Sequence, residues 1–481
     1  MNLSRKIAVL GGGICGLTSA YRLSKCKPDW RVKLFESSDR LGGLLGTREE
    51  NGYLVEQSAD NFISNAAAPW ANDLCHEIGF DHEIIAPNEE HRRALIWLRG
   101  KLHAIPDGFQ LMKTSDIGAV FRSSLLSWPG KFRLAAEPFI PTLRAGVNGD
   151  PNRIPDESLA SFATRRLGKE AFERLVQPLV AGIYTADANK LSMKAALPQF
   201  AKMEQTAGSL TAAARREAVR NANASSKLSG SGARYGQFLA PKRGMSSLID
   251  ALARQLDPTS INFQRAATGI SRADSKWQIS FADGTNENFD GVICCLPSMV
   301  ASRLVHKLDD ELASQLSSIE HASSTVVCLG YSQDQFRRPL DAFGCVIPII
   351  AGRKCIAISF SSMKYPGRAT SQNHLLRVFI GGAVQPELAT LDDAESIQLA
   401  IDEVQSILRV TGSPNHIFVQ RWTDTMPQYH IGHLDKVDSI RKRLSQHPGL
   451  EIESNALDGV GIPQRVHAAE TAAKRVVEAL E

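Results

Sequence analysis

The sequence predicts an α/β fold that joins a parallel β-α-β domain, a helical insertion and a separate β-rich domain. Three observations predict this fold. A short apolar strand, a glycine turn and an amphipathic helix open the chain over residues 5–24. Helical patterns dominate residues 75–205, and short β-rich runs follow one another over residues 324–380. A chain of 481 residues is too long for one core, so two or three domains are expected.

Composition is that of an ordinary globular protein, with 43% hydrophobic and 22% charged residues. A net charge of +4 is too small to indicate nucleic-acid binding, so no nucleic-acid partner is expected. The eight cysteines form no C-x-x-C pair and no His/Cys group with zinc spacing. We therefore expect reduced thiols, no metal site and a cytoplasmic location. The polar start is unlike a secretion signal, and no apolar run is long enough to predict a membrane span.

The glycine turn is the first chemical signal. Gly11, Gly13 and Gly16 form G-x-G-x-x-G between the strand at 5–10 and the following helix. In this context the glycines permit a tight turn, close approach of a pyrophosphate, and close packing of helix on strand. Glu36 ends the next strand, where an acidic residue binds a ribose hydroxyl. The pattern predicts a Rossmann-like dinucleotide-binding domain.

A second glycine pair distinguishes between dinucleotides. Arg40, Gly42 and Gly43 follow the acidic strand end directly. An arginine and a glycine pair at this place indicate a second grip on the phosphates of a longer dinucleotide. This favours FAD over NAD.

The remaining elements are predicted in chain order. A capped helix within 155–168 stops at Gly168, and another over 169–184 stops near Pro178 and Gly182. Small polar residues at 221–233 predict a linker, 277–297 a strand, a turn and a strand, and 464–480 a final helix. The predicted layout has six units: a first FAD-binding segment (1–75), a helical unit (76–205), a linker (206–240), a second FAD-binding segment (241–300), a β-rich substrate-binding unit (301–425) and a third FAD-binding segment (426–481).

Four further stretches narrow the class. They are GKLHAIPDG (100–108), RRLGKEAFERLVQPLVAGIYTADANKLS (165–192), MPQYHIGH (426–433) and NALDGVGIP (455–463). Together with the N-terminal motif, they resemble the protoporphyrinogen oxidase family of the FAD-dependent amine oxidase superfamily. The matches cover nearly the whole chain in the family's order, and plain amine oxidases do not carry the 165–192 stretch.

One turn departs from the family. Where the family has an E-x-G-P-type turn against the flavin, this chain has EQSADNF (56–62), with Ser58 and Ala59 in place of glycine and proline. Serine restricts φ at a position suited to glycine, so this wall is expected to differ in shape.

The resemblance implies one FAD site, bound non-covalently, because the last cysteine is Cys355 and the C-terminal segment has none to form a thioether. The start of the chain would hold the phosphates, and NALDGVGIP would form the far wall at the start of the last helix, facing the ring edge that becomes anionic on reduction. The implied FAD-binding residues are Gly11, Gly12, Gly13, Ile14, Cys15, Gly16, Glu36, Ser37, Arg40, Gly43, Leu44, Ser58, Ala59, Asp60, Asn61, Ala267, Asn455, Val460, Gly461 and Ile462.

The resemblance also implies a porphyrinogen substrate with O₂ as electron acceptor. Three rounds of hydride removal to the flavin would give the aromatic porphyrin and hydrogen peroxide, and no general base is assigned because the cofactor carries the chemistry. Arginine suits a bidentate grip on a propionate, and of Arg92 and Arg93 the second is chosen. The expected substrate contacts are Arg93, Gly182, Val346, Phe360 and Phe379, and His103, His430 and His433 are expected to be structural.

Several alternatives stay open. The substrate could be protoporphyrinogen IX, or coproporphyrinogen III with its two additional carboxylates; the enzyme could be another FAD-dependent amine oxidase or desaturase, or a silent flavin-binding protein. Residues 111–144 interleave Lys and Arg with apolar residues, as a peripheral membrane contact would require, but a plain amphipathic helix pair has the same pattern. The resemblance leaves a homodimer open.

Overall fold

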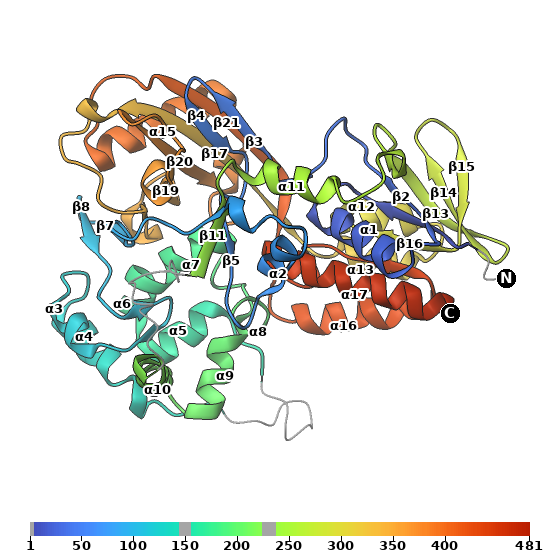
Figure 1. Ribbon diagram of the computed structural model, residues 1–481. Coiled ribbons are helices and arrows are strands. Elements are labelled where there is room, and N and C mark those ends of the chain that lie inside the picture. Colours follow the sequence, from blue (N-terminus) through green and yellow to red (C-terminus); the bar gives the residue numbers. More distant parts are fainter. Residues whose placement is uncertain (1–3, 144–154, 224–236) are drawn as a thin grey trace.

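A computed structural model describes residues 4–143, 155–223 and 237–481 (Figure 1). The first and last elements of the chain lie together in one lobe, which contains a parallel sheet. A large mixed sheet and a group of helices form the rest of the molecule (Figure 1). Segments far apart in sequence therefore build one lobe.

Five strands form the parallel sheet, in the order β12-β2-β1-β16-β22. They are β1 (Lys6–Leu10), β2 (Arg31–Phe35), β12 (Ile261–Asn262), β16 (Gly291–Cys294) and β22 (Leu450–Ile452). Side chains of β1 alternate between two cores, because successive residues of a strand face opposite sides. Ile7 and Val9 pack beneath the helices of one face, and Ala8 and Leu10 pack on the other face.

Different elements pack on the two faces of the parallel sheet. The first carries α1 (Ile14–Cys26), α2 (Trp70–Glu77), α11 (Met245–Ala253) and α17 (Ile462–Leu480). The second carries the meander of β13 (Ala267–Ala273), β14 (Lys276–Phe281) and β15 (Asn286–Phe289) with α12 (Ser298–Val305), α13 (Asp310–Ser317) and α16 (His433–Leu444). The sequence predicted one strand and a turn before β16, but the structure forms two strands there.

A seven-stranded mixed sheet, in the order β21-β17-β20-β19-β18-β7-β8, forms the second body. Its strands are β7 (Ala94–Leu98), β8 (Lys101–Ala104), β17 (His321–Ser332), β18 (Gly344–Val346), β19 (Ala357–Phe360), β20 (Asn373–Gly381) and β21 (His416–Pro427). The hairpin of β3 (Thr47–Glu50) and β4 (Tyr53–Glu56) packs on one face through Tyr53 and Val55, and α15 (Asp393–Leu408) covers the other. The unit 76–205, in which helical patterns dominate, thus also contributes strands β7 and β8, and β7 gains its partner β18 from about 250 residues later in the chain.

Helices form the third body. They are α3 (Ile117–Arg122), α4 (Trp128–Ala135), α5 (Leu159–Leu167), α6 (Lys169–Ala171), α7 (Gln177–Tyr184), α8 (Met193–Ala196), α9 (Pro198–Ala207) and α10 (Leu210–Asn223). None of the helices in the described ranges combines the length and apolar character needed to cross a bilayer.

Two helix predictions need correction. The helix after Gly168 does not stop near Pro178: a π-helical turn over Phe172–Val176 leads into α7, where the proline lies in the first turn and leaves no donor unpaired. The predicted linker 206–240 contains α10 and, after the residues outside the described ranges, strand β11 (Phe238–Pro241). The predicted polar stretch at 221–233 lies almost entirely outside the described residues.

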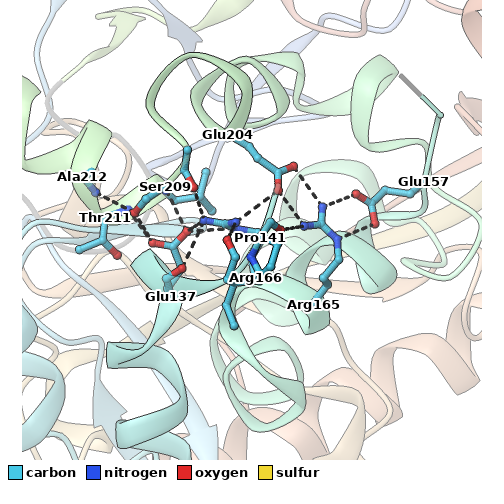
Figure 2. A network of polar contacts seen from close by, with 12 residues as sticks. Glu137, Pro141, Glu157, Arg165, Arg166, Glu204, Ser209, Thr211 and Ala212 are labelled. Carbon is cyan, nitrogen blue, oxygen red and sulfur yellow. Dashed lines mark hydrogen bonds and ion pairs between the residues drawn. The ribbon is translucent and has the colours of Figure 1, made fainter. Parts of the chain in front are cut away.

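A buried ionic cluster joins α5, α9 and α10 to the turn at Glu137 (Figure 2). The carboxylate of Glu137 is fully buried and accepts hydrogen bonds from the backbone N–H groups of Leu210 and Thr211 at the start of α10. The guanidinium of Arg166, also fully buried, pairs with Glu137 and lies 3.3 Å from Glu204. Each charge is thus compensated inside the helical body.

Candidate functional site

The glycine loop joins β1 to α1, and its shape requires glycine at two positions. Gly11 has φ +104°, in a region that L side chains rarely adopt. A Cβ on Gly16 would lie 1.9 Å from the carbonyl oxygen of Gly11. A Cβ on Gly13 would meet only the oxygen of Gly42, at 3.9 Å, so this glycine leaves open space above the loop. The loop is therefore a cradle with packed flanks and an open centre.

Glu36 organises the residues around this cradle. Its Oε2 accepts the Gly12 N–H at 2.7 Å, and its Oε1 accepts the Ser38 N–H at 2.8 Å. The backbone N–H of Arg265 donates to the Glu36 carbonyl, which brings the segment of Ala267 beside the loop. The hydroxyls of Ser37 and Ser38 also donate to Oε1, so Oε2, which accepts only the Gly12 N–H, is the oxygen with a lone pair left for a ribose hydroxyl.

Arg40 holds the second glycine turn in shape. Its guanidinium donates to the carbonyl oxygens of Gly43 at 2.7 Å and Leu45 at 3.0 Å. The Gly42 N–H donates in turn to the Gly12 carbonyl, so the two glycine turns lie against each other. The structure thus brings together the phosphate-side residues that the sequence predicts, and gives Arg40 a structural role in the loop.

The last helix meets the same region from the other side. α17 begins after Gly461 with no side chain capping its first N–H groups. Asn455 lies in the loop before it, donates from Nδ2 to the Thr425 carbonyl at 3.2 Å, and accepts at its own carbonyl from the Tyr429 hydroxyl. Helix α1 also begins without a side-chain cap, at Gly13. Two open helix N-termini face the site, as an anionic ligand requires.

The altered turn at 56–62 is built without strain. Ser58 is not among the residues with positive φ, so serine costs nothing at this position. Its carbonyl accepts from the buried guanidinium of Arg377 on β20. Ser58 thus has a backbone conformation that any residue adopts, and the different shape of this wall stays a prediction.

Asp60 in the same turn is held as a carboxylate. Lys364 Nζ lies 3.1 Å from its Oδ2, and Arg377 NH1 lies 3.6 Å from the same atom. Burial raises the pKa of Asp60, but these two cations outweigh it and hold the pKa below its usual value. Asn61 Nδ2 donates to Asp60 Oδ1 at 2.6 Å. The turn thus carries a fixed, compensated negative charge.

These residues fit FAD. The open glycine cradle, the carboxylate with a spare lone pair and the two uncapped helix N-termini are what a dinucleotide with a negative pyrophosphate needs. When bound, FAD would supply the hydride-accepting ring. The chain's own residues would bind it, orient it and shield it from water.

Three of the five predicted substrate residues come together. Val346 on β18, Ala357 on β19 and Phe379 on β20 are consecutive partners across the sheet, so they share one face. A Cβ on Gly182 would lie 3.6 Å from Val346 Cγ1, so α7 meets this face at ordinary contact distance. The guanidinium of Arg377 lies 5.3 Å from the Phe379 ring and also reaches the Ser58 turn. The apolar wall and the turn therefore adjoin.

Phe360 was wrongly predicted to lie on this wall. It pairs with Leu376, whereas Phe379 pairs with Ala357, so the two phenylalanines project from opposite faces of the sheet. Phe360 is 1% exposed and packs in the core beneath α15. Sequence alone cannot give this parity, because it depends on the register between β19 and β20.

The structure favours Arg92, rather than Arg93, as the arginine that could contact a substrate carboxylate. Arg93 is 47% exposed, and its guanidinium bonds the backbone and side chain of Asp341. The Arg92 side chain is 13% exposed; its NH2 donates to Glu89 Oε1 at 3.1 Å, and its Nε has no hydrogen-bond partner among the described residues. The loop before Arg92 is tied to the Asp60 turn, because the Asn88 N–H donates to the carbonyl of Lys364. Arg92 is therefore the arginine with an open donor next to the site.

Histidine residues have structural surroundings, as the sequence predicts. His433 stacks on Tyr429 with ring centroids 4.3 Å apart, and burial lowers its pKa to about 4. Burial likewise lowers the pKa of His430. His103 Nδ1 lies 2.8 Å from Ser124 Oγ. Sequence reasoning missed Lys364, Arg377 and Arg465, because single basic residues in strands and helices give no pattern signal.

Comparison with known proteins finds similar proteins over nearly the whole length of the chain. Residues 14–477 match the model of the family described as flavin containing amine oxidoreductase. A coproporphyrinogen III oxidase of Bacillus subtilis is 27% identical, and the alignment covers 95% of each chain. Protoporphyrinogen oxidase 2 of Arabidopsis thaliana is 26% identical, with 99% of this chain and 94% of that protein covered.

A solved structure is also similar to this chain over nearly its whole length. A protein from an Exiguobacterium species, assigned as a protoporphyrinogen oxidase, superposes with a TM-score of 0.83 at 28% identity over 98% of both chains. The chain therefore belongs to the flavin-containing amine oxidoreductase family, and it is an FAD-dependent oxidoreductase similar to the porphyrinogen oxidases.

Proposed function

We propose that this chain oxidises protoporphyrinogen IX to protoporphyrin IX in haem biosynthesis, with FAD as hydride acceptor and O₂ reduced to hydrogen peroxide. One observation carries the proposal. The apolar wall of Gly182, Val346 and Phe379 adjoins the flavin-side turn through Arg377. A flexible, apolar tetrapyrrole with carboxylate side chains suits such a wall beside a cation.

The charges at the site favour a substrate with few carboxylates. Asp60 pairs with Lys364 and Arg377, and Arg92, Arg368 and Arg377 each keep an Nε without a hydrogen-bond partner among the described residues. Coproporphyrinogen III, with two more carboxylates, would need more cations. It remains the second candidate because the Bacillus subtilis relative is named for it.

An assay with both substrates tests the proposal. The purified flavoprotein is mixed in air with each porphyrinogen, and porphyrin fluorescence and peroxide are followed. Faster turnover of protoporphyrinogen IX at equal concentration is expected. Preference for coproporphyrinogen III would support the second candidate, and bound flavin with no porphyrin from either substrate would refute both.

Arg92 gives a sharper test of substrate contact. Arg92→Met is expected to raise KM for protoporphyrinogen about tenfold or more, since a hydrogen bond to a charged group contributes ~1.5–3 kcal/mol. Arg93→Met, the matched control, should leave KM within about twofold because Arg93 is bound to Asp341 at the surface. Steady-state kinetics decide, and the reverse ranking would return the carboxylate role to Arg93.

We also propose that a cytoplasmic form of the protein touches a membrane surface peripherally through α3 and α4. Trp128 and Phe132 are 63% and 62% exposed and Phe139 is 85% exposed, with Lys131 4.6 Å from the Trp128 ring. Exposed aromatics suit a bilayer interface, whereas Lys131 itself is buried and donates to the Phe121 carbonyl at 2.9 Å. The predicted stretch 111–144 is described up to residue 143.

A sedimentation assay with phosphatidylglycerol vesicles tests this contact. Replacing Trp128, Phe132 and Phe139 by serine is expected to weaken binding about tenfold or more, because burying each aromatic contributes ~1.5–3 kcal/mol. The matched control replaces Ile349 and Ile350, which are 52% and 49% exposed elsewhere on the surface. Equal binding of both variants and the wild type would refute the proposal.

A further inference from the structure

A buried arginine with open donors lies in the first turn of α17. Arg465 is 7% exposed, and its NH1 donates to the Ser454 carbonyl at 2.6 Å. Its Nε and NH2 have no hydrogen-bond partner among the described residues. A buried charge with two unused donors is costly, so some other charge must make it favourable.

The position of Arg465 relates it to the flavin wall. Its N–H donates to the carbonyl of Gly461, the residue just before α17, and its guanidinium donates to the carbonyl of Ser454, the residue just before Asn455. Helical side chains lean toward the helix N-terminus, which places this guanidinium directly behind the loop of residues 455–461. Gly461 and Asn455 are positions assigned to the far wall of the flavin.

Charged groups on three neighbouring elements surround Glu453, which directly precedes the Ser454 whose carbonyl accepts from Arg465. On α16, Arg441 NH2 lies 2.9 Å from Glu453 Oε2 and also binds Asp458 in the loop. Further along α17, Arg475 NH1 lies 3.8 Å from Glu453 Oε1 and 3.4 Å from Glu451 on β22. Among these groups Glu453 is 1% exposed, and its Oε1 lacks a hydrogen-bond partner within the described ranges.

We propose that Arg465 and Glu453 act as positioning residues that set the reduction potential of the bound flavin. Arg465 supplies positive charge behind the ring edge that gains negative charge on reduction, and the Glu453 carboxylate opposes it. A fixed charge in a buried site interacts strongly with the negative charge that the flavin ring gains on reduction, because little water lies between them to screen the interaction. The inference depends on FAD binding but not on which porphyrinogen is oxidised.

The titration of Glu453 predicts that the midpoint potential of the flavin depends on pH. Burial raises the pKa of Glu453 to about 7, and Arg441 and Arg465 only partly offset the burial. Below pH 7 the protonated carboxyl leaves the charge of Arg465 unopposed and favours reduced flavin. Above pH 7 the carboxylate forms and disfavours it. An additional downward bend in midpoint potential is therefore expected near pH 7.

Redox titration of the purified holoprotein with reference dyes tests the proposal. Arg465→Met at pH 8 should lower the ratio of reduced to oxidised flavin at fixed potential about tenfold, equal to ~30 mV for a two-electron couple. Glu453→Gln should shift the potential upward at pH 8 and remove the bend near pH 7. If the two substitutions only loosened the flavin site, opposite shifts of the midpoint potential in Arg465→Met and Glu453→Gln would not be expected.

Two controls complete the test. Arg475→Met removes a 44%-exposed charge from the same cluster and should change the ratio less than twofold. If Arg465→Met does not fold, Glu453→Gln alone decides by the direction of its shift. A change under twofold in both Arg465→Met and Glu453→Gln, or shifts of the same sign, would overturn the proposal.

Discussion

Gly16→Ala is expected to abolish tight FAD binding. The new Cβ would lie 1.9 Å from the carbonyl oxygen of Gly11, and that oxygen is backbone that no rotamer change can move. α1 would have to separate from β1, which displaces the N–H groups of the phosphate loop. Overpacking of this kind costs ~1–3 kcal/mol, so an affinity loss of about 100-fold is expected.

FAD titration of the apoprotein, followed by flavin fluorescence, measures this loss. Gly13→Ala separates packing from binding, because its Cβ meets nothing nearer than 3.9 Å within the chain. We expect Gly13→Ala to keep the melting temperature of the apoprotein but to weaken FAD binding, whereas Gly16→Ala lowers both. Wild-type FAD affinity in Gly16→Ala would show that the loop does not hold the pyrophosphate.

Glu137→Ala is expected to destabilise the helical body by about 3–5 kcal/mol, the cost of removing one partner of a buried ion pair. The substitution removes the carboxylate that pairs with Arg166 and leaves the Ser209 hydroxyl and two N–H groups of α10 without their acceptor (Figure 2). Arg166 is fully buried and would keep its charge without Glu137. Urea unfolding measured by circular dichroism gives the change in the free energy of unfolding.

A surface ion pair provides the matched control. Asp341→Ala removes the partner of Arg93, where both side chains are about half exposed, and should cost less than about 1 kcal/mol. Burial opposes ionisation of Glu137, but hydrogen bonds from Ser209, Leu210 and Thr211 outweigh it and lower its pKa. Its stabilisation is therefore present above the ordinary glutamate pKa and lost as pH falls through the lowered one. Equal losses in Glu137→Ala and Asp341→Ala would contradict the role of burial.

Local chemistry made the phosphate side of the site predictable. Gly11, Gly16 and Glu36 stand at spacings that one strand, one turn and one helix dictate, so short-range geometry alone brings them together. Asn455 and Gly461 were predicted only through the resemblance of their segment. Local pattern could not place them beside Gly11, because β22 and β1 are separated in the sheet by β16.

The substrate side was predicted less well, since it depends on pairing between distant strands. Val346 and Phe379 share a face because β18, β19 and β20 align in one register, and the same register turns Phe360 to the opposite face. Likewise, the sequence alone cannot distinguish the neighbours Arg92 and Arg93. Only the tertiary structure shows that Arg93 pairs with Asp341 at the surface.

The sequence by itself determined the α/β class and the family, and it predicted the phosphate-binding half of the FAD site, because those depend on residues close together in the chain. Only the tertiary structure decided which arginine is open, which phenylalanine faces the wall, and that Arg465 and Glu453 lie behind the flavin segment. Those features arise from strand register and from helices packed across hundreds of residues, where burial gives each charge its energy.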